Sequence, residues 1–87
     1  MATAAASPTP NPNATKYTLD VTLPATMNLA SVEAAEAEGN DFAAAVLATE
    51  GVASVFGTAD FVTVTRQPGA DWAPITAAVQ AAAADHL

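Results

Sequence analysis

The residues that could support catalysis are few and lie far apart. The single histidine, His86, is the penultimate residue, where the C-terminal end of a helix dipole favours a cation at the surface. The serines, Ser7, Ser31 and Ser54, lie outside any Gly-x-Ser-x-Gly turn, and none shares a local element with the histidine. Because a nucleophile needs a base within hydrogen-bonding reach, the sequence predicts a protein that is not an enzyme.

Carboxylates are the remaining candidates for chemistry, as ligands of a metal ion. Four of them lie close together in the sequence, at Glu33, Glu36, Glu38 and Asp41. The glycine and the ligand spacing of an EF-hand are missing, so a solvated acidic face is the favoured interpretation and no metal site is assigned. Weak iron binding by these carboxylates is the alternative, because hard oxygen ligands can hold iron. The chain has no cysteine and offers no thiolate to iron or zinc.

The segment Thr9-Pro-Asn-Pro-Asn13, which we call the Pro-Asn arm, is the most unusual part of the chain. Prolines fix the backbone angle φ, and asparagine amides bond to neighbouring backbone in Asx-turns. One interpretation is an ordered entry into the first strand. The other is a preorganised surface for a partner, since little chain entropy would be lost on binding. The residues alone favour the first.

Alternating patterns predict the strands that must position these residues. Residues 16–23 alternate between polar and apolar side chains, which predicts a half-buried strand ended by Pro24. Residues 27–32 are expected to return as the second strand of a hairpin. Residues 52–56 and 61–66 are β-branched and aromatic runs joined by a four-residue connection, and we expect them to pair antiparallel.

Two helices are expected. Asn40 or Asp41 caps the first, which ends at Gly51 in the left-handed backbone conformation. Asp71 caps the second, and Trp72 in its first turn is interpreted as a core anchor and not as an exposed contact residue. The larger side chains expected to supply the buried area are Leu19, Val21, Phe42, Val46, Val55, Val62, Val64, Trp72, Ile75 and Val79.

The order β-β-α-β-β-α predicts an α+β fold, with a mostly antiparallel sheet of about four strands and both helices on one face. The length of 87 residues fits one core. We expect residues 1–8 to be a flexible N-terminal segment and residues 9–87 to form a single domain.

The net charge of the chain limits the kinds of partner that it can bind. Nine acidic and two basic residues give a formal net charge of −7, which repels phosphate backbones and anionic lipid. Neither nucleic acid nor a membrane is an expected partner, and no stretch approaches the roughly 20 apolar residues of a membrane span. Residues 1–7 lack the regions of a signal peptide, so we expect a cytoplasmic location. We also expect a monomer. A basic protein partner stays possible.

The arm, followed by Lys16-Tyr17, resembles the T-P-N-P-N-x-x-K-[FY] opening of the N-terminal domain of NifU-like (Nfu-type) iron-sulfur cluster scaffold proteins. Three further motifs follow in the order of that family. They are Glu50-Gly-Val-Ala-Ser-Val-Phe56, Asp60-Phe-Val-Thr-Val-Thr65 and Asp71-Trp72. Together the motifs span the chain from Thr9 onward, and their shared order makes the resemblance specific.

The resemblance implies a role in building or delivering iron-sulfur clusters. Full-length members hold the cluster with a C-x-x-C motif in a separate C-terminal domain, and this sequence shows neither. We therefore expect a stand-alone domain that binds no cofactor by itself and meets an iron-sulfur cluster only through a partner. The expected partners are proteins of cluster assembly or client apoproteins. The partner-binding residues that the resemblance suggests are Thr9, Pro10, Asn11, Pro12, Asn13 and Lys16, together with Asp60 and Phe61.

Two function classes remain. The first is a non-catalytic accessory or adaptor module that binds protein partners through the Pro-Asn arm and an adjoining sheet edge. The second is a weak iron carrier that uses surface carboxylates.

Overall fold

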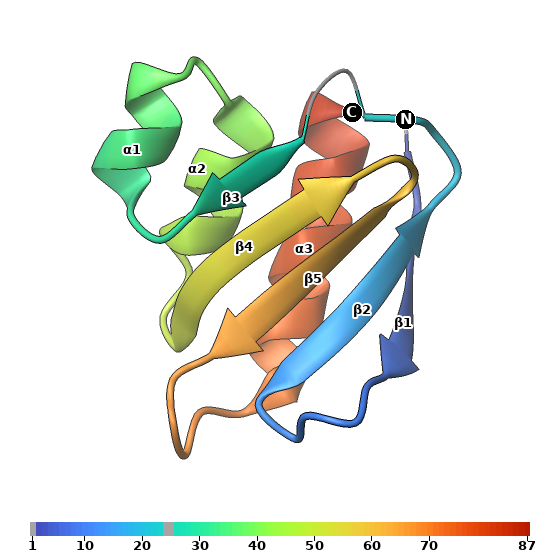
Figure 1. Ribbon diagram of the computed structural model, residues 1–87, viewed down its shortest axis with the longest axis vertical. Helices are drawn as coiled ribbons and strands as arrows, with labels where there is room; N and C mark the ends of the chain where they lie inside the picture. Colours follow the sequence, from blue (N-terminus) through green and yellow to red (C-terminus); the bar gives the residue numbers. More distant parts are fainter. Residues whose placement is uncertain (1, 24–25) are drawn as a thin grey trace.

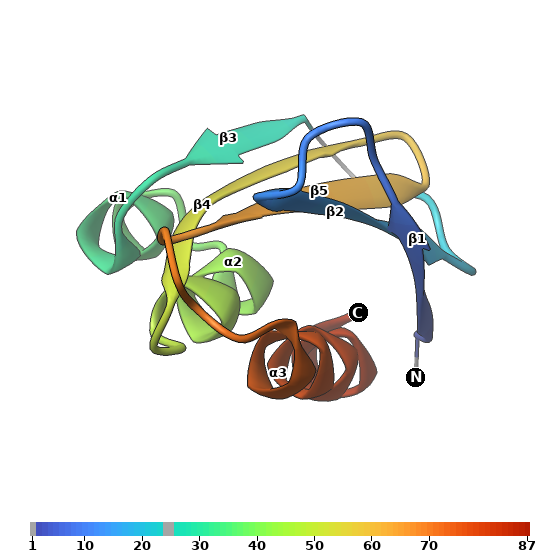
Figure 2. The ribbon, with the colours of Figure 1, turned by 90° about the horizontal axis from the view of Figure 1, so that it is seen from below.

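The computed structural model describes residues 2–23 and 26–87. Its strands form one antiparallel sheet in the order β1-β2-β5-β4-β3 (Figure 1). The strands are β1 (Ala4–Pro8), β2 (Ala14–Leu19), β3 (Met27–Leu29), β4 (Val52–Thr58) and β5 (Phe61–Arg66). The helices are α1 (Val32–Ala37), α2 (Asp41–Leu47) and α3 (Trp72–His86). Helices α2 and α3 cover one face of the sheet and α1 packs beside α2, so the fold has two layers (Figure 2).

The α+β class is confirmed, but the expected number and order of elements are wrong. The described residues form five strands and three helices in the order β-β-β-α-α-β-β-α, against the expected four strands and two helices in the order β-β-α-β-β-α. The differences lie at β1, at β3 and at α1. Each of these elements is short or lacks a clear periodic pattern.

Strand β1 arises from the N-terminal segment that was expected to be flexible. It pairs antiparallel with β2 over its whole length. Ala2 and Ala4 are buried, and the side-chain amide of Gln80 in α3 donates a hydrogen bond to the Ala4 carbonyl at 3.3 Å. A run of alanines shows no alternation of polar and apolar residues, so only its pairing with β2 and its contact with α3 define this strand.

Strand β3 pairs with β4 at the edge opposite β1, and not with β2 as the expected hairpin requires. Both edges of β2 are already occupied, by β1 and by β5. The strand is also shorter than residues 27–32, because Ser31 caps α1 by accepting a hydrogen bond from the Ala34 N–H at 3.2 Å. The expected strand end at Pro24 lies outside the described residues.

Strands β4 and β5 form the expected antiparallel hairpin, with a shorter connection. Gly57 and Thr58 belong to β4, which leaves Ala59 and Asp60 as the turn. Ala59 has a φ of 52°, the left-handed conformation that tight hairpin turns favour. Gly57 allows β3 to approach closely, since a Cβ atom there would lie 3.0 Å from Cγ of Met27.

The expected helix caps at Asn40 and Asp71 are confirmed. Their side chains accept hydrogen bonds from backbone N–H groups at 3.0 Å and 3.1 Å, respectively. However, α2 ends at Leu47 and not at Gly51. Gly51, with a φ of 94°, instead forms the turn that leads into β4.

The inward face of the sheet and the apolar sides of the helices form one core. The side chains expected in this core are buried, except that Val21 and Trp72 are half-buried and pack against it. Alanines dominate α3, and Ala82 and Ala83 allow this helix to lie close to its neighbours. No helix among residues 2–23 and 26–87 has the length and apolar character needed to cross a bilayer.

Tyr17 is the fully buried polar aromatic of the core. Its hydroxyl lies 2.9 Å from the Thr76 hydroxyl in α3. Burial raises the pKa of Tyr17 above its ordinary value of 10.0, and the hydrogen bond to Thr76 partly opposes this shift. The folded protein therefore favours the neutral phenol more strongly than the unfolded chain does.

We expect the free energy of unfolding to fall as the pH rises above 10, because Tyr17 of the unfolded chain then releases its proton before Tyr17 of the folded protein does. The contribution is present below pH 10 and is lost as the pH passes the raised pKa of the folded state. Urea denaturation at a series of pH values measures this slope. The matched variant Tyr17→Phe shares every other titrating group and should show a flatter decline. Equal slopes in the two proteins would contradict the assignment.

Candidate functional site

The Pro-Asn arm is the connection between β1 and β2. The Thr9 hydroxyl lies 2.9 Å from the carbonyl oxygens of both Asn11 and Ala14, and it accepts a hydrogen bond from the Asn11 N–H at 3.2 Å. The Ala14 N–H donates to the Asn11 carbonyl at 3.1 Å. Thr9 thereby holds the two ends of the arm together.

The second half of the arm is fixed by its asparagines. Oδ1 of Asn11 accepts a hydrogen bond from the Asn13 N–H at 2.9 Å, which is the Asx-turn that the sequence suggests. The Asn13 carbonyl accepts from the Arg66 N–H at 2.8 Å, and Oδ1 of Asn13 accepts from Nε of Arg66 at 3.3 Å. These bonds attach the arm to the end of β5.

Arg66 also connects the arm to α3. Its guanidinium lies over the Trp72 ring, 5.4 Å from the ring centroid, and its Nη1 donates to the Ala70 carbonyl at 2.7 Å. The indole N–H of Trp72 points to the Pro12 carbonyl with a longer separation of 3.5 Å. Trp72 therefore packs partly against the core. Its ring also contacts the Arg66 guanidinium, which attaches the arm to β5.

The arm is thus an ordered entry into β2, the first of the two interpretations. The side-chain oxygens of Thr9, Asn11 and Asn13 are engaged within the chain, while Pro10, Asn11 and Pro12 are exposed. Any contact of the arm with a partner would therefore fall mainly on these three consecutive residues. Because the arm is already ordered, binding there would cost little conformational entropy.

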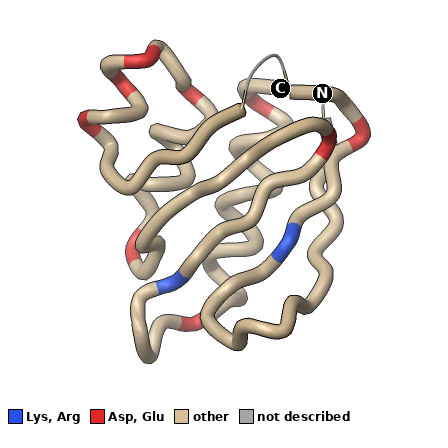
Figure 3. The backbone as a smooth tube through the Cα atoms, viewed as in Figure 1, with Lys and Arg blue, Asp and Glu red and all other residues tan. Residues whose placement is uncertain are grey.

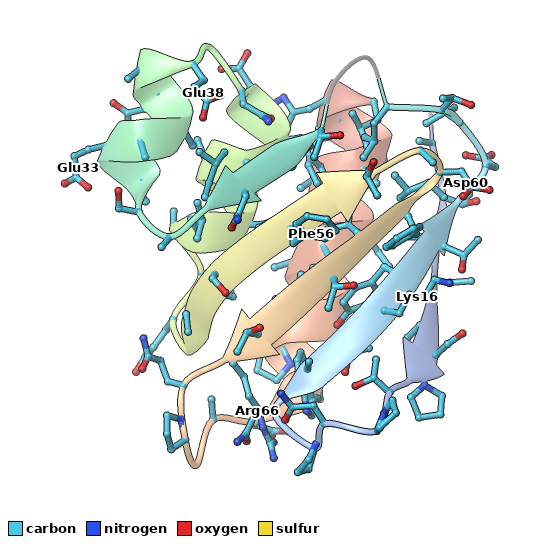
Figure 4. All side chains as sticks on the ribbon, in the orientation of Figure 1. Lys16, Glu33, Glu38, Phe56, Asp60 and Arg66 are labelled. Atoms are coloured by element: carbon cyan, nitrogen blue, oxygen red, sulfur yellow. The ribbon has the colours of Figure 1, made fainter. Side chains whose placement is uncertain are left out.

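The structure does not bring all the suggested partner-binding residues together. Asp60 lies in the β4–β5 turn, where its carbonyl accepts from the Leu19 N–H at 2.7 Å, at the end of β5 opposite Arg66 and the arm (Figure 4). Lys16 lies between these two ends. Its Nζ sits over the Phe61 ring, 4.6 Å from the ring centroid.

The helices leave one face of the sheet uncovered, which we call the open face (Figures 1 and 2). Lys16 and Phe61 belong to this face, because their chain neighbours Tyr17 and Val62 are paired with each other and buried on the other face. The strand registers place on this face Ala5, Ser7, Ala14, Lys16, Thr18, Asn28, Ser54, Phe56, Thr58, Phe61, Thr63 and Thr65. Half of these side chains bear a hydroxyl group. Phe56 is the large apolar side chain that stands out, an aromatic ring with 40% of its surface exposed.

Phe56 was missed as a candidate from the sequence. It faces Thr63 across the hairpin, and Thr63 in turn faces Lys16, so Phe56 and Lys16 point to the same side (Figure 4). Strict alternation from Val55 would have placed Phe56 outward. A register shift between Val52 and Ser54 obscures this pattern in the sequence.

The acidic residues do not converge on a metal site. Within residues 2–23 and 26–87, no group of three or more histidine, cysteine, aspartate or glutamate side chains could hold a metal ion. Glu38 and Asp41 do line a hollow of about 340 Å³ with His86, between the start of α2 and the end of α3. His86 lies 45 or more positions from these two residues in the sequence, so the three come together only in the folded chain.

We expect Thr9→Val to lower the free energy of unfolding by about 1 kcal/mol, because valine keeps the shape of the side chain but removes the hydroxyl that closes the arm. Thr9→Ser is the matched control, since it retains the hydroxyl. Urea denaturation of the three proteins measures the difference. A valine variant as stable as the serine variant would show that these bonds contribute little.

Solved structures of other proteins share the fold of this chain. The crystal structure of protein SAV1430 from Staphylococcus aureus is similar, with a TM-score of 0.74 and 29% identity over 90% of this chain and 93% of that chain. Its solution structure gives a TM-score of 0.67 and 30% identity over 94% and 89% of the two chains. SeR13 from Staphylococcus epidermidis, at 24% identity and a TM-score of 0.61 over 93% of each chain, shares the fold.

A search of curated proteins gave no match. Residues 4–87 match the family model described as scaffold protein Nfu/NifU N terminal, which confirms the resemblance over nearly the whole chain. The match begins with the first residue of β1, so the family pattern includes the strand that the sequence analysis overlooked. The chain belongs to the family of Nfu/NifU scaffold protein N-terminal domains.

Proposed function

We propose that this chain is a non-catalytic accessory or adaptor module in iron-sulfur cluster assembly or delivery, which acts by binding protein partners. The observation that carries the proposal is the family match over residues 4–87 in a chain with no cysteine. Thiolates are the usual ligands of iron-sulfur clusters. A family member without them contributes to cluster assembly through contacts with other proteins, with the cluster as the partner's cargo.

The geometry of the arm supports a binding role. A segment that is ordered before binding loses little entropy in a complex, and the arm is held at both ends by hydrogen bonds within the chain. Its exposed surface includes the rigid rings of Pro10 and Pro12. We propose cluster-assembly proteins or client apoproteins as the partners.

A pull-down from a reducing cell extract tests the adaptor role. The immobilised 87-residue chain is expected to recover proteins of cluster assembly or their clients. Pro10→Ala combined with Pro12→Ala removes the exposed rings and should recover less of the same proteins. Asn11→Ala and Asn13→Ala loosen the arm from within and should weaken recovery through loss of order. If the wild-type chain recovers none of these proteins, the adaptor proposal fails.

The carboxylate iron carrier is the alternative, and the spacing of the acidic side chains gives it no support. Anaerobic titration with ferrous iron, followed by calorimetry, should show no saturable site, because dispersed and solvated carboxylates bind weakly. Glu38→Gln combined with Asp41→Asn is the matched variant for the acidic hollow. A saturable heat signal that this variant loses would favour the iron carrier.

A further inference from the structure

The open face carries no carboxylate, although the chain has nine acidic residues. Every aspartate and glutamate lies in a helix, a turn or a loop, outside the five strands of the described chain. Lys16 is the charged group on the open face, since Arg66 packs against Trp72 on the helix side. Figure 3 shows the result, an acidic border around a sheet whose surface is free of negative charge.

Phe56 lies on β4, between Asn28 of β3 and Thr63 of β5. With 40% of its surface exposed, it is the large apolar side chain that the described residues leave in solvent. Burying an aromatic ring in a protein contact yields more free energy than burying most other side chains. The flanking hydroxyl and amide groups can hydrogen-bond around such an anchor. This arrangement has the apolar centre and polar surroundings of a contact surface.

Size and charge distinguish between the possible occupants. Strands about 4.8 Å apart and about 20 Å long give this sheet a face of roughly 400 Å², and stable interfaces bury about 800 Å² per partner. The open face alone is therefore too small for a stable interface with any protein, and a contact there must extend onto the acidic border. Two chains of formal charge −7 repel each other at that border, which argues against a symmetric dimer. A nucleic acid meets the same repulsion from the acidic border.

A protein whose contact surface has a basic border fits both the exposed Phe56 ring and the acidic border. Exposed acidic residues flank the β4–β5 hairpin at its two ends, with Glu50 just before β4 and Asp60 in the turn before β5. Lysine or arginine side chains of a partner would meet these carboxylates while its apolar centre covers Phe56. Contacts with the border also extend the interface beyond the sheet face itself.

We propose that the open face, anchored by Phe56, docks a folded partner protein whose contact surface has an apolar centre and a border of lysine and arginine side chains. The inference rests on the proposed adaptor function and names the surface it uses. The main contact then lies on the sheet face, whereas the hypothesis from the sequence put it on the Pro-Asn arm and an adjoining sheet edge. The modest area makes the contact transient and strongly dependent on ionic strength.

Site-specific photo-crosslinking identifies what covers this surface. Benzoylphenylalanine in place of Phe56 is compared, in cells, with the same group in place of Ala77, an exposed position on α3. A protein crosslinked at position 56 and not at position 77 is identified by mass spectrometry and purified. Its binding to the whole chain is then measured by calorimetry at low and at physiological salt.

In the reconstituted complex, we expect Phe56→Thr to weaken binding at least about tenfold, the loss typical of an aromatic anchor. Threonine suits a strand and matches the neighbouring hydroxyls, and a thermal melt checks that the variant folds. Thr18→Glu, which adds a carboxylate to the open face, should also weaken binding. Glu50→Gln combined with Asp60→Asn should slow association and reduce its salt dependence.

Three results would overturn the inference. The first is that no crosslink forms at position 56. The second is a crosslink only to a second copy of the chain or to nucleic acid. The third is a reconstituted partner whose binding Phe56→Thr leaves unchanged. If the pull-down recovers cluster-assembly proteins and Phe56→Thr leaves that recovery unchanged, the adaptor function stands and only the surface is wrong. If the pull-down recovers nothing, the adaptor function itself fails.

Discussion

Side chains of β2 and β5 alternate between the two faces of the sheet, and the helices cover only one of these faces. Tyr17, Val62 and Val64 are consequently buried on the helix-covered face, and their sequence neighbours point to the other face. A slip of one residue in this register would expose the core and bury Lys16. The packing of the two central strands against α3 therefore determines both where the core lies and which residues the open face presents.

The two cations of the chain are used differently on the two faces. Arg66 joins the arm, the end of β5 and the start of α3 on the helix side. These contacts explain why the arm is ordered although its prolines are exposed. Lys16 lies on Phe61 on the open side and makes the surface of the sheet slightly basic. The carboxylates are confined to the ends of the sheet and to the helices, so the open face and its border differ in charge.

The proposed function is recognition and not ligation of the cluster, and these two tasks need different chemistry. Ligation of iron needs deprotonated sulfur, which no residue of this chain supplies. Recognition needs shape, order and complementary charge, and the sheet and the arm offer these. The acidic hollow beside His86 lies apart from both surfaces, and its residues do not form a metal site.

The sequence by itself determined the local features: the caps at Asn40 and Asp71, the β4–β5 hairpin, the family motifs and the lack of thiolates. These depend on neighbouring residues or on composition. Tertiary structure alone decided that residues 4–8 form β1, that β3 joins β4, and that Arg66 meets Trp72 and Asn13. It also decided which face the helices leave open around Phe56. The reason is that strand pairing and side-chain packing join residues distant in the sequence, and runs of alanine and short strands carry no periodic signal of their final neighbours.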